Sequence, residues 1–180
     1  MIKRGLYPGR FQPFHLGHLN AIKNILKECD ELIIVIGSAQ YSHLADNPFT
    51  AGERLYMIRR SLEENNIDVS RIWLVPVPDL HLHMMWVSVV EGYTPPFDVV
   101  FSNEPLTRRL FTERGYEVAK LPFYKRNVLS STQIRKMILN RDNWESYVPK
   151  TVAAFVKSID GVNRLQALTL TDKGDSVVSS

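Results

Sequence analysis

The chain has 180 residues, a formal net charge of +3, and hydrophobic and charged shares of 44% and 23%, which favour a folded globular protein over a disordered one. Its single cysteine excludes an intrachain disulfide, and no apolar run reaches the roughly 18 residues of a membrane span. We see no secretory leader at the N-terminus and expect a cytoplasmic protein with no membrane partner.

Apolar strands and amphipathic helices alternate along the sequence. Strands are expected at residues 2–8, 31–36, 71–77, 97–102 and 116–121. Apolar residues at spacings of three and four predict helix faces within residues 19–29, 55–62, 85–93, 106–111, 134–138 and 152–159. This order predicts a Rossmann-like, doubly wound parallel α/β sheet of about five strands, with helices on both faces and a C-terminal helical segment.

The sequence shows one domain and no internal repeat. We expect this domain to span residues 1–168, followed by a disordered tail over 169–180 that is rich in Ser, Thr and Asp and lacks periodicity. Two helix starts carry capping-box spacings, Thr50 with Glu53 and Ser130 with Gln133. Ligands of parallel sheets bind beyond the carboxyl ends of the strands, so motifs that follow the strands should converge there.

The first such motif is Gly9-Arg10-Phe11-Gln12-Pro13-Phe14-His15-Leu16-Gly17-His18, between the first strand and the first helix. Backbone N–H groups, the positive helix end, the Arg10 guanidinium and the imidazoles of His15 and His18 together favour a phosphate site. Gly17 would let the backbone approach the phosphate closely. A single histidine here would be read as a helix cap. A zinc site is a weaker interpretation, because no third ligand lies nearby, and we expect no metal bound by protein ligands.

The second motif is Leu129-Ser130-Ser131-Thr132-Gln133-Ile134-Arg135, more than a hundred residues later. Its hydroxyl and N–H groups suit phosphate oxygens, and Arg135 offers a planar guanidinium with several donors. Alone, this motif would be an ordinary helix cap with a surface arginine. Arg126, just before it, is a further phosphate candidate or a solvated surface residue.

The two motifs resemble the H-x-G-H and I-S-S-T-x-I-R motifs of the nucleotidyltransferase superfamily. The stretch Asn47-Pro48-Phe49-Thr50-Ala51-Gly52-Glu53-Arg54 and Trp86 narrow the resemblance to archaeal-type nicotinamide-mononucleotide adenylyltransferases. Ser38, Gln40, Ser42 and His43 also match the S-A-Q-x-S-H run of that family. The resemblance covers roughly residues 4–165. It implies AMP transfer from ATP to nicotinamide mononucleotide (NMN), giving NAD and pyrophosphate, with Mg²⁺ or a similar ion on ATP, in an enzyme that is often a homo-oligomer.

The resemblance also implies roles for individual residues. Catalysis would rest on His15, His18 and Arg135. ATP and phosphates would contact a set that spans both motifs: Gly9, Arg10, Phe11, Gly17, Ser102, Arg126, Leu129, Ser130 and Thr132. The nicotinamide nucleotide would contact Ser38, Asp79, His83 and Trp86, where Trp86 stacks on the nicotinamide ring; by periodicity alone, Trp86 would be a core residue.

This chain departs from the family pattern at four positions. His83 stands where the family has asparagine, which bears on the choice between the amide and acid forms of the mononucleotide. Asn103 and Glu104 replace Gly-Asn in the S-G-N-P turn, and Asp46 stands where some members have a basic residue. A carboxylate at Glu104 is unfavourable near phosphates unless it faces solvent or a metal.

Other functions stay open at this point. The acceptor could be nicotinate mononucleotide, phosphopantetheine or a phospho-alcohol, and the same fold could serve as a nucleotide sensor without catalysis. Nucleic-acid binding would rest only on a pI of about 9.0, and no run of Lys and Arg supports it, so we expect no nucleic-acid partner.

Overall fold

The computed structural model describes residues 3–80, 82–122 and 129–174. Five strands form one parallel sheet in the order β3-β2-β1-β4-β5. The strands are β1 (Arg4–Gly9), β2 (Glu31–Ile36), β3 (Ile72–Pro76), β4 (Val99–Phe101) and β5 (Glu117–Ala119). The predicted Rossmann-like sheet is confirmed, although β4 and β5 are shorter than the apolar runs that predicted them.

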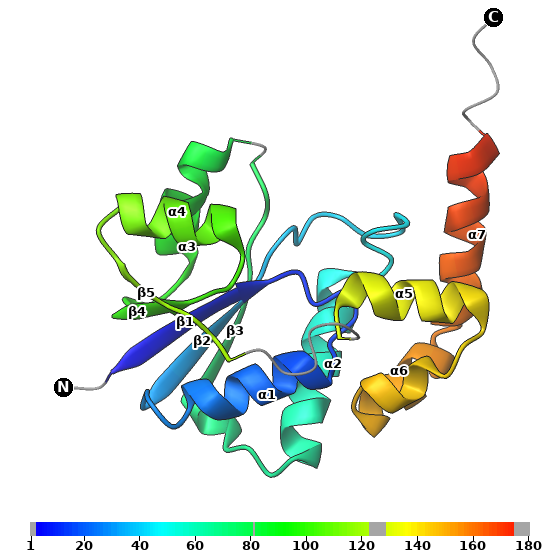
Figure 1. Cartoon of the computed structure of the whole chain (residues 1–180), viewed down its shortest axis with the longest axis horizontal. Coiled ribbons are helices and arrows are strands. Elements are labelled where there is room, and N and C mark those ends of the chain that lie inside the picture. The colour runs from blue at the N-terminus through cyan, green and yellow to red at the C-terminus, as the bar shows by residue number, and fades with distance from the viewer. Residues whose placement is uncertain (1–2, 81, 123–128, 175–180) are drawn as a thin grey trace, which may run out of the picture.

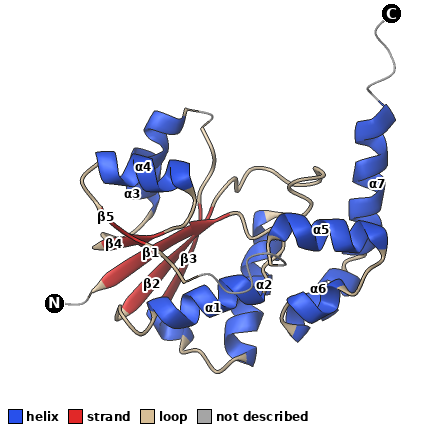
Figure 2. Ribbon diagram, in the orientation of Figure 1, coloured by secondary structure: helices blue, strands red, loops and turns tan. Residues whose placement is uncertain are grey.

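Helices cover both faces of this sheet (Figures 1 and 2). The helices are α1 (Leu16–Ile25), α2 (Ala51–Glu64), α3 (Trp86–Tyr93), α4 (Pro105–Glu113), α5 (Ser131–Asn140), α6 (Lys150–Ser158) and α7 (Gly161–Gly174). Short 3₁₀ turns occupy Val69–Arg71, His83–Met85 and Trp144–Tyr147.

Strand β2 shows how the core is divided. Leu32, Ile34 and Ile36 pack with α1, α2, α5 and α6 on one face, whereas Ile33 and Val35 pack with α3 and α4 on the other. Side chains of a strand alternate between the two faces, so a strand covered on both sides must be apolar throughout. All five residues after Glu31 in β2 are accordingly buried.

One expectation about a helix face is wrong. In α3 the buried residues are Val87 and Val90, while Met85 and Tyr93 of the predicted stripe are 42% and 54% exposed. The last helix, α7, packs on the core through Leu165 and Val162. The expected boundary at residue 168 and the disordered tail beyond it stay predictions.

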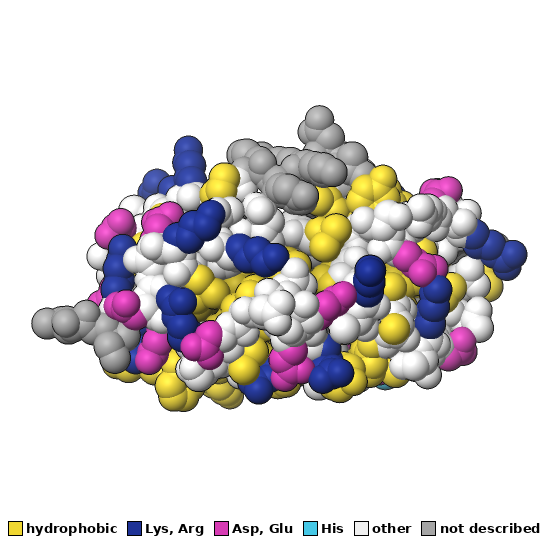
Figure 3. Space-filling view, turned by 90° about the horizontal axis from the view of Figure 1, so that it is seen from below, with side chains coloured by type: hydrophobic (Ala, Val, Ile, Leu, Met, Phe, Trp, Pro, Cys, Tyr) yellow, Lys and Arg dark blue, Asp and Glu magenta, His cyan; other side chains and the backbone are white. Residues whose placement is uncertain are grey.

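Charges are mixed on the surface. On the face shown in Figure 3, Lys and Arg side chains are interspersed with Asp and Glu side chains. Within the described ranges, no helix combines the length and the apolar composition that a membrane crossing requires.

Candidate functional site

The connections place two cavities at the carboxyl end of the sheet. The chain runs outward from β1 to β2 and β3, then returns to β4 on the other side of β1, which makes β1 and β4 the switch point. One cavity, of about 530 Å³, is lined mainly by the ends of β1 and β2 and by α3 and α4; the other, of about 590 Å³, is lined by the first and second motifs. Arg10 and Glu104 line both, so the two cavities adjoin. We call them the α3 cavity and the histidine cavity.

His15 and His18 build the start of α1 as well as the wall of the histidine cavity. His15 is the N-cap, and its Nδ1 accepts the N–H groups of Gly17 at 3.1 Å and His18 at 3.3 Å. The Nδ1 of His18 accepts the N–H of His15 at 3.2 Å, and the two rings are stacked with their centroids 3.5 Å apart. The capping interpretation and the phosphate interpretation therefore describe different nitrogens of the same rings.

The caps determine the tautomer of both rings. Because each Nδ1 accepts a hydrogen bond, the single proton of each neutral imidazole is on Nε2. Burial lowers the pKa of His15 to about 3, and burial together with the adjacent His15 lowers the pKa of His18 well below its usual range. Two neutral rings thus carry Nε2–H donors, and neither Nε2 has a partner among the residues that the structure describes.

Gly17 lies against the His15 ring. A Cβ at this position would lie 2.9 Å from Cε1 and Nδ1 of that ring. The residue is not among those that line the two cavities. The structure therefore shows a close approach of the Gly17 backbone to an imidazole, and the expected approach to a phosphate stays a prediction.

The second motif docks on the first. The Ser131 hydroxyl donates to the Pro13 carbonyl at 3.0 Å, and Arg135 donates through Nη1 to the Gln12 carbonyl at 2.8 Å. Ser130 is the N-cap of α5 and accepts the Gln133 N–H, while Thr132 is exposed at the cavity wall. Burial and the nearby Arg10 lower the pKa of Arg135, with Asp46 acting in the opposite sense. These contacts bring the two distant motifs into one cavity.

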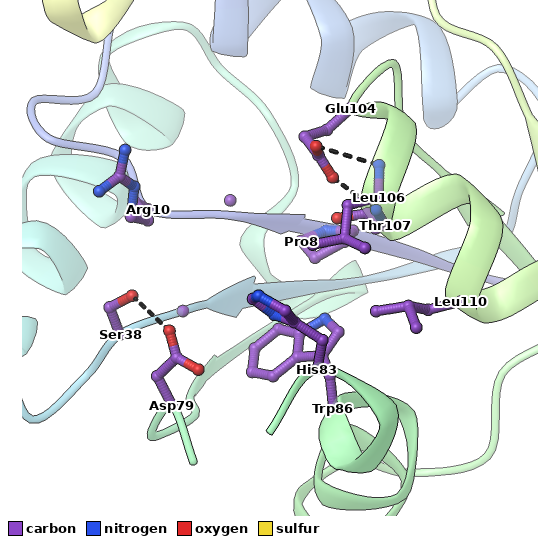
Figure 4. A pocket seen from close by; sticks show the side chains of 12 residues that line it. Pro8, Arg10, Ser38, Asp79, His83, Trp86, Glu104, Leu106, Thr107 and Leu110 are labelled. Atoms are coloured by element: carbon purple, nitrogen blue, oxygen red, sulfur yellow. Dashed lines mark hydrogen bonds between the residues drawn. The ribbon is translucent and has the colours of Figure 1, made fainter. Parts of the chain in front are cut away.

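The α3 cavity contains the residues expected to contact a nicotinamide nucleotide (Figure 4). Ser38 donates from its hydroxyl to Asp79 at 3.4 Å, and the Gln40 side chain exchanges two hydrogen bonds with the Asp79 backbone. Trp86 is half-buried at the start of α3 and lies against Gly37. His83 is exposed at the same wall, so all four predicted residues line this cavity.

The two charged residues shared by the cavities are each engaged in a contact. Arg10 pairs with Asp46 at 3.2 Å, and both side chains are more than half exposed. Glu104 is the N-cap of α4 and accepts the N–H groups of Leu106 and Thr107. Burial raises the pKa of Glu104, but these donors and the charge of His83 outweigh burial and leave it lowered. The carboxylate predicted to be unfavourable is thus held by a helix end.

The remaining predicted residues differ in whether they line a cavity. Gly9, Phe11 and Leu129 line the cavities. Ser102 is buried, lines neither cavity, and accepts the Glu104 N–H through its hydroxyl. Asn103 exchanges two hydrogen bonds with the backbone of Leu121. Arg126 lies outside the described residues.

Two buried polar residues next to the site, Gln12 and Arg54, are not among the predicted site residues. The side-chain amide of Gln12 exchanges two hydrogen bonds with the Phe49 backbone, at 2.8 and 3.0 Å. Arg54, fully buried, donates to the carbonyls of Arg10, Gly37, Ser38 and Thr50. Both residues stand in motifs singled out in the sequence, but apart from Thr50 their partners lie 16 to 44 residues away and leave no local signal.

The donor set bears on metal binding. Among the described residues, no group of three or more His, Cys, Asp or Glu side chains is arranged to hold a metal ion. Glu104, the carboxylate that lines the histidine cavity, is used to cap α4.

Comparison with known proteins adds independent information. A family model described as cytidylyltransferase-like matches residues 6–137. The nicotinamide-nucleotide adenylyltransferase of Saccharolobus solfataricus is 51% identical over 172 residues, which cover 96% of this chain and 100% of that protein. That of Thermoplasma volcanium is also 51% identical, over 94% of each chain.

A solved structure supports the fold. A bifunctional NMN adenylyltransferase/ADP ribose pyrophosphatase from Francisella tularensis, complexed with AMP and a manganese ion, superposes with a TM-score of 0.76 at 24% identity. The match covers 96% of this chain and 53% of that one.

Proposed function

Because the chain belongs to the nicotinamide-nucleotide adenylyltransferase family, we propose that it transfers AMP from ATP to NMN, giving NAD and pyrophosphate. The observation that carries this proposal is the pair of adjoining cavities, which share Arg10 and Glu104. One is lined by an aromatic ring and an acidic residue, and the other by neutral imidazole donors and a helix N-terminus. Such a pair suits two nucleotides whose phosphates meet at the shared wall.

In the proposed reaction, an oxygen of the NMN phosphate attacks the α-phosphorus of ATP. The bond from that phosphorus to the bridging oxygen of the β-phosphate breaks, and pyrophosphate leaves. The Nε2–H groups of His15 and His18 donate to the α-phosphate oxygens as their charge develops, and Arg10 attracts both phosphates. This mechanism needs positioning and charge stabilisation but no protein nucleophile.

The leaving pyrophosphate is assigned to the start of α5. Ser130, Thr132 and Arg135 line that part of the histidine cavity, and the helix N-terminus is positive. ATP enters as its Mg²⁺ complex, with the ion bound by phosphates and water, since no described cluster of protein ligands would hold it.

NMN is assigned to the α3 cavity, where Trp86 stacks on the nicotinamide ring and Asp79 and His83 line the wall. Replacement of Trp86 by alanine should raise KM for NMN and leave KM for ATP nearly unchanged, because stacking is worth about 1 kcal/mol or more. Steady-state kinetics with each substrate varied would check this. An unchanged KM for NMN would remove the nicotinamide assignment and favour another phosphorylated acceptor.

The enzyme is further proposed to be a cytoplasmic homo-oligomer.

The first test is pyrophosphate release with ATP and Mg²⁺, using NMN and nicotinate mononucleotide in parallel. Release with NMN is expected, and the ratio of the two rates reports how His83 affects the choice between amide and acid. Absence of release with both would contradict the proposed acceptor.

Replacement of His18 by alanine should lower kcat by about a hundredfold or more, with ATP binding largely retained. Equal turnover of the variant and the wild type would favour a different role for the histidine pair.

A further inference from the structure

Arg54 is a charged residue that lines neither cavity, and it is fully buried at the first turn of α2. Its guanidinium has no carboxylate partner among the described residues; all four of its hydrogen bonds go to backbone carbonyls. Burial, with a smaller effect of Arg10, lowers its pKa to about 10, so it stays charged at neutral pH. A buried charge without a counter-ion is unfavourable for stability, which suggests a functional reason for its presence.

Two of the four carbonyls that Arg54 binds occupy equivalent places in the backbone, each just before a residue with positive φ. Its Nη1 donates to the carbonyl of Arg10 at 2.9 Å and to that of Gly37 at 2.7 Å. The residues that follow them, Phe11 and Ser38, have φ angles of +53° and +49°. Positive φ is strained for residues other than glycine and persists only where the surroundings enforce it. One nitrogen thus holds the peptide groups that enter two left-handed turns, after β1 and after β2.

The orientation of these peptide groups has a consequence for the cavities. In a trans peptide the N–H lies on the opposite side from the C=O. Because the carbonyls of Arg10 and Gly37 face Arg54, the N–H groups of Phe11 and Ser38 face away from it. Neither N–H has a protein acceptor among the described residues. Phe11 lines the histidine cavity and Ser38 the α3 cavity, where Ser38 lies near Arg10 (Figure 4).

We propose that Arg54 is a positioning residue, which fixes the two left-handed turns so that the Phe11 N–H meets the ATP phosphates and the Ser38 N–H meets the phosphate of NMN. Backbone N–H groups presented in this way form anion-binding concavities. The inference deepens the proposed function and rests on it for the identity of the two phosphates. It assigns Arg54 an effect on both substrates through one guanidinium, without any contact to either.

The chain offers a matched control. Arg71 also donates its guanidinium to three backbone carbonyls, those of Leu26, Cys29 and Asp30, but at the opposite end of the sheet, before β3. Arg54→Lys and Arg71→Lys both retain the charge and lose the planar fork. Arg54→Lys should raise KM for both ATP and NMN by on the order of tenfold or more. Arg71→Lys should lower the melting temperature only. Unchanged KM values in a folded Arg54→Lys variant would overturn the proposal.

A double-mutant cycle separates turn positioning from a general effect of the buried charge. Glycine adopts positive φ without strain, so Ser38→Gly should make the turn after β2 less dependent on Arg54. The fold-increase in KM for NMN caused by Arg54→Lys should be smaller in the Ser38→Gly background than in the wild type. Both variants in the Ser38→Gly background lack the Ser38 hydroxyl, so the effect of its loss on KM cancels. Equal increases in both backgrounds would contradict the positioning role.

A binding measurement without turnover keeps the test independent of activity and of variant folding. In ¹H–¹⁵N spectra of the wild-type chain, ATP should shift the Phe11 amide, and NMN the Ser38 amide. If neither amide responds at saturation, the proposal is wrong. If both respond but no pyrophosphate is released from ATP with either mononucleotide, the proposed acceptor chemistry fails while the phosphate contacts of the two amides stand.

Discussion

The two stacked histidines have a structural role that the structure shows and a catalytic role that we propose. In both rings Nδ1 accepts a backbone N–H at the start of α1, which leaves Nε2–H for a ligand. Burial keeps both rings neutral by lowering the pKa of His15 to about 3 and that of His18 well below the usual range. The cap therefore orients the donors before any substrate arrives, which is the condition for effective electrostatic stabilisation.

This arrangement predicts the protonation state directly. The ¹⁵N shifts of both imidazoles should report the neutral tautomer with the proton on Nε2, unchanged between pH 7.5 and pH 5.5. The reason is that charging either ring would cost desolvation and break an accepted hydrogen bond. A ring that titrates near its unperturbed pKa of about 6.5 would disagree with the geometry.

Gly17 gives a second prediction at this scale. Gly17→Ala would place a Cβ 2.9 Å from the His15 ring, so the ring must move and its caps weaken. We expect kcat to fall by on the order of tenfold or more, since a displacement of about 1 Å at a reacting group is costly. Gly52→Ala is a suitable control, because a Cβ there would meet only Thr50 Oγ1 at 3.9 Å. Equal kinetics for the two variants would mean that the His15 position tolerates the shift.

Between elements, a few polar clamps hold together the segments that form the cavities. Gln12 joins the loop after β1 to the segment before α2, and Arg135 and Ser131 join α5 to the same loop. At the other end of the segment before α2, Arg164 of α7 donates to Glu53 at 2.8 Å and to the Pro48 carbonyl at 3.3 Å. Helix α7 thus stabilises the N-terminal cap of α2, the helix that carries Arg54.

The contact of Arg164 in α7 with Glu53 in α2 should contribute measurably to the free energy of unfolding. Arg164→Met removes a partly buried ion pair with Glu53 and should lower the free energy of unfolding by about 1–2 kcal/mol. Arg59→Met removes a more exposed pair with Glu63 within α2 and should change it by about 0.5 kcal/mol or less. Chemical denaturation of both variants would check the difference. Similar losses would show that the α7 contact contributes no more than a surface pair.

For the whole molecule, the histidine pair couples stability to pH. The folded pKa values of His15 and His18 lie below the unfolded value of about 6.5, so the unfolded chain binds more protons between these limits. The associated stability is present above about pH 6.5 and is lost as the pH falls, by up to about 1.4 kcal/mol per pH unit for each ring.

Denaturation between pH 6.5 and pH 5.0 should therefore show a falling free energy of unfolding in the wild type. The doubly substituted variant His15→Gln, His18→Gln should show a shallower slope over the same interval, because it lacks both titrating groups. If the two slopes are equal, the pair does not contribute to acid sensitivity.

Sequence by itself determined the parallel sheet, the positions of its strands to within a few residues, and the two motifs that meet in one cavity. These features depend on local periodicity and on the rule that the strands of a parallel sheet end at one edge. It also determined the family, through residues whose spacing is specific. The exposure of Met85 and Tyr93 could not be predicted, since the buried face of a helix is selected by neighbours that a short window of sequence does not contain.

Only the tertiary structure decided what the buried polar residues do. The nitrogen that each histidine keeps for a ligand depends on which backbone N–H groups the other nitrogen accepts. The roles of Gln12 and Arg54 depend on carbonyl partners up to 44 residues away along the chain. A hydrogen bond is set by distance and direction between atoms in space, and such pairs leave no periodic trace in the sequence. The sequence thus predicts which groups meet at the site, and the fold determines how these groups are oriented.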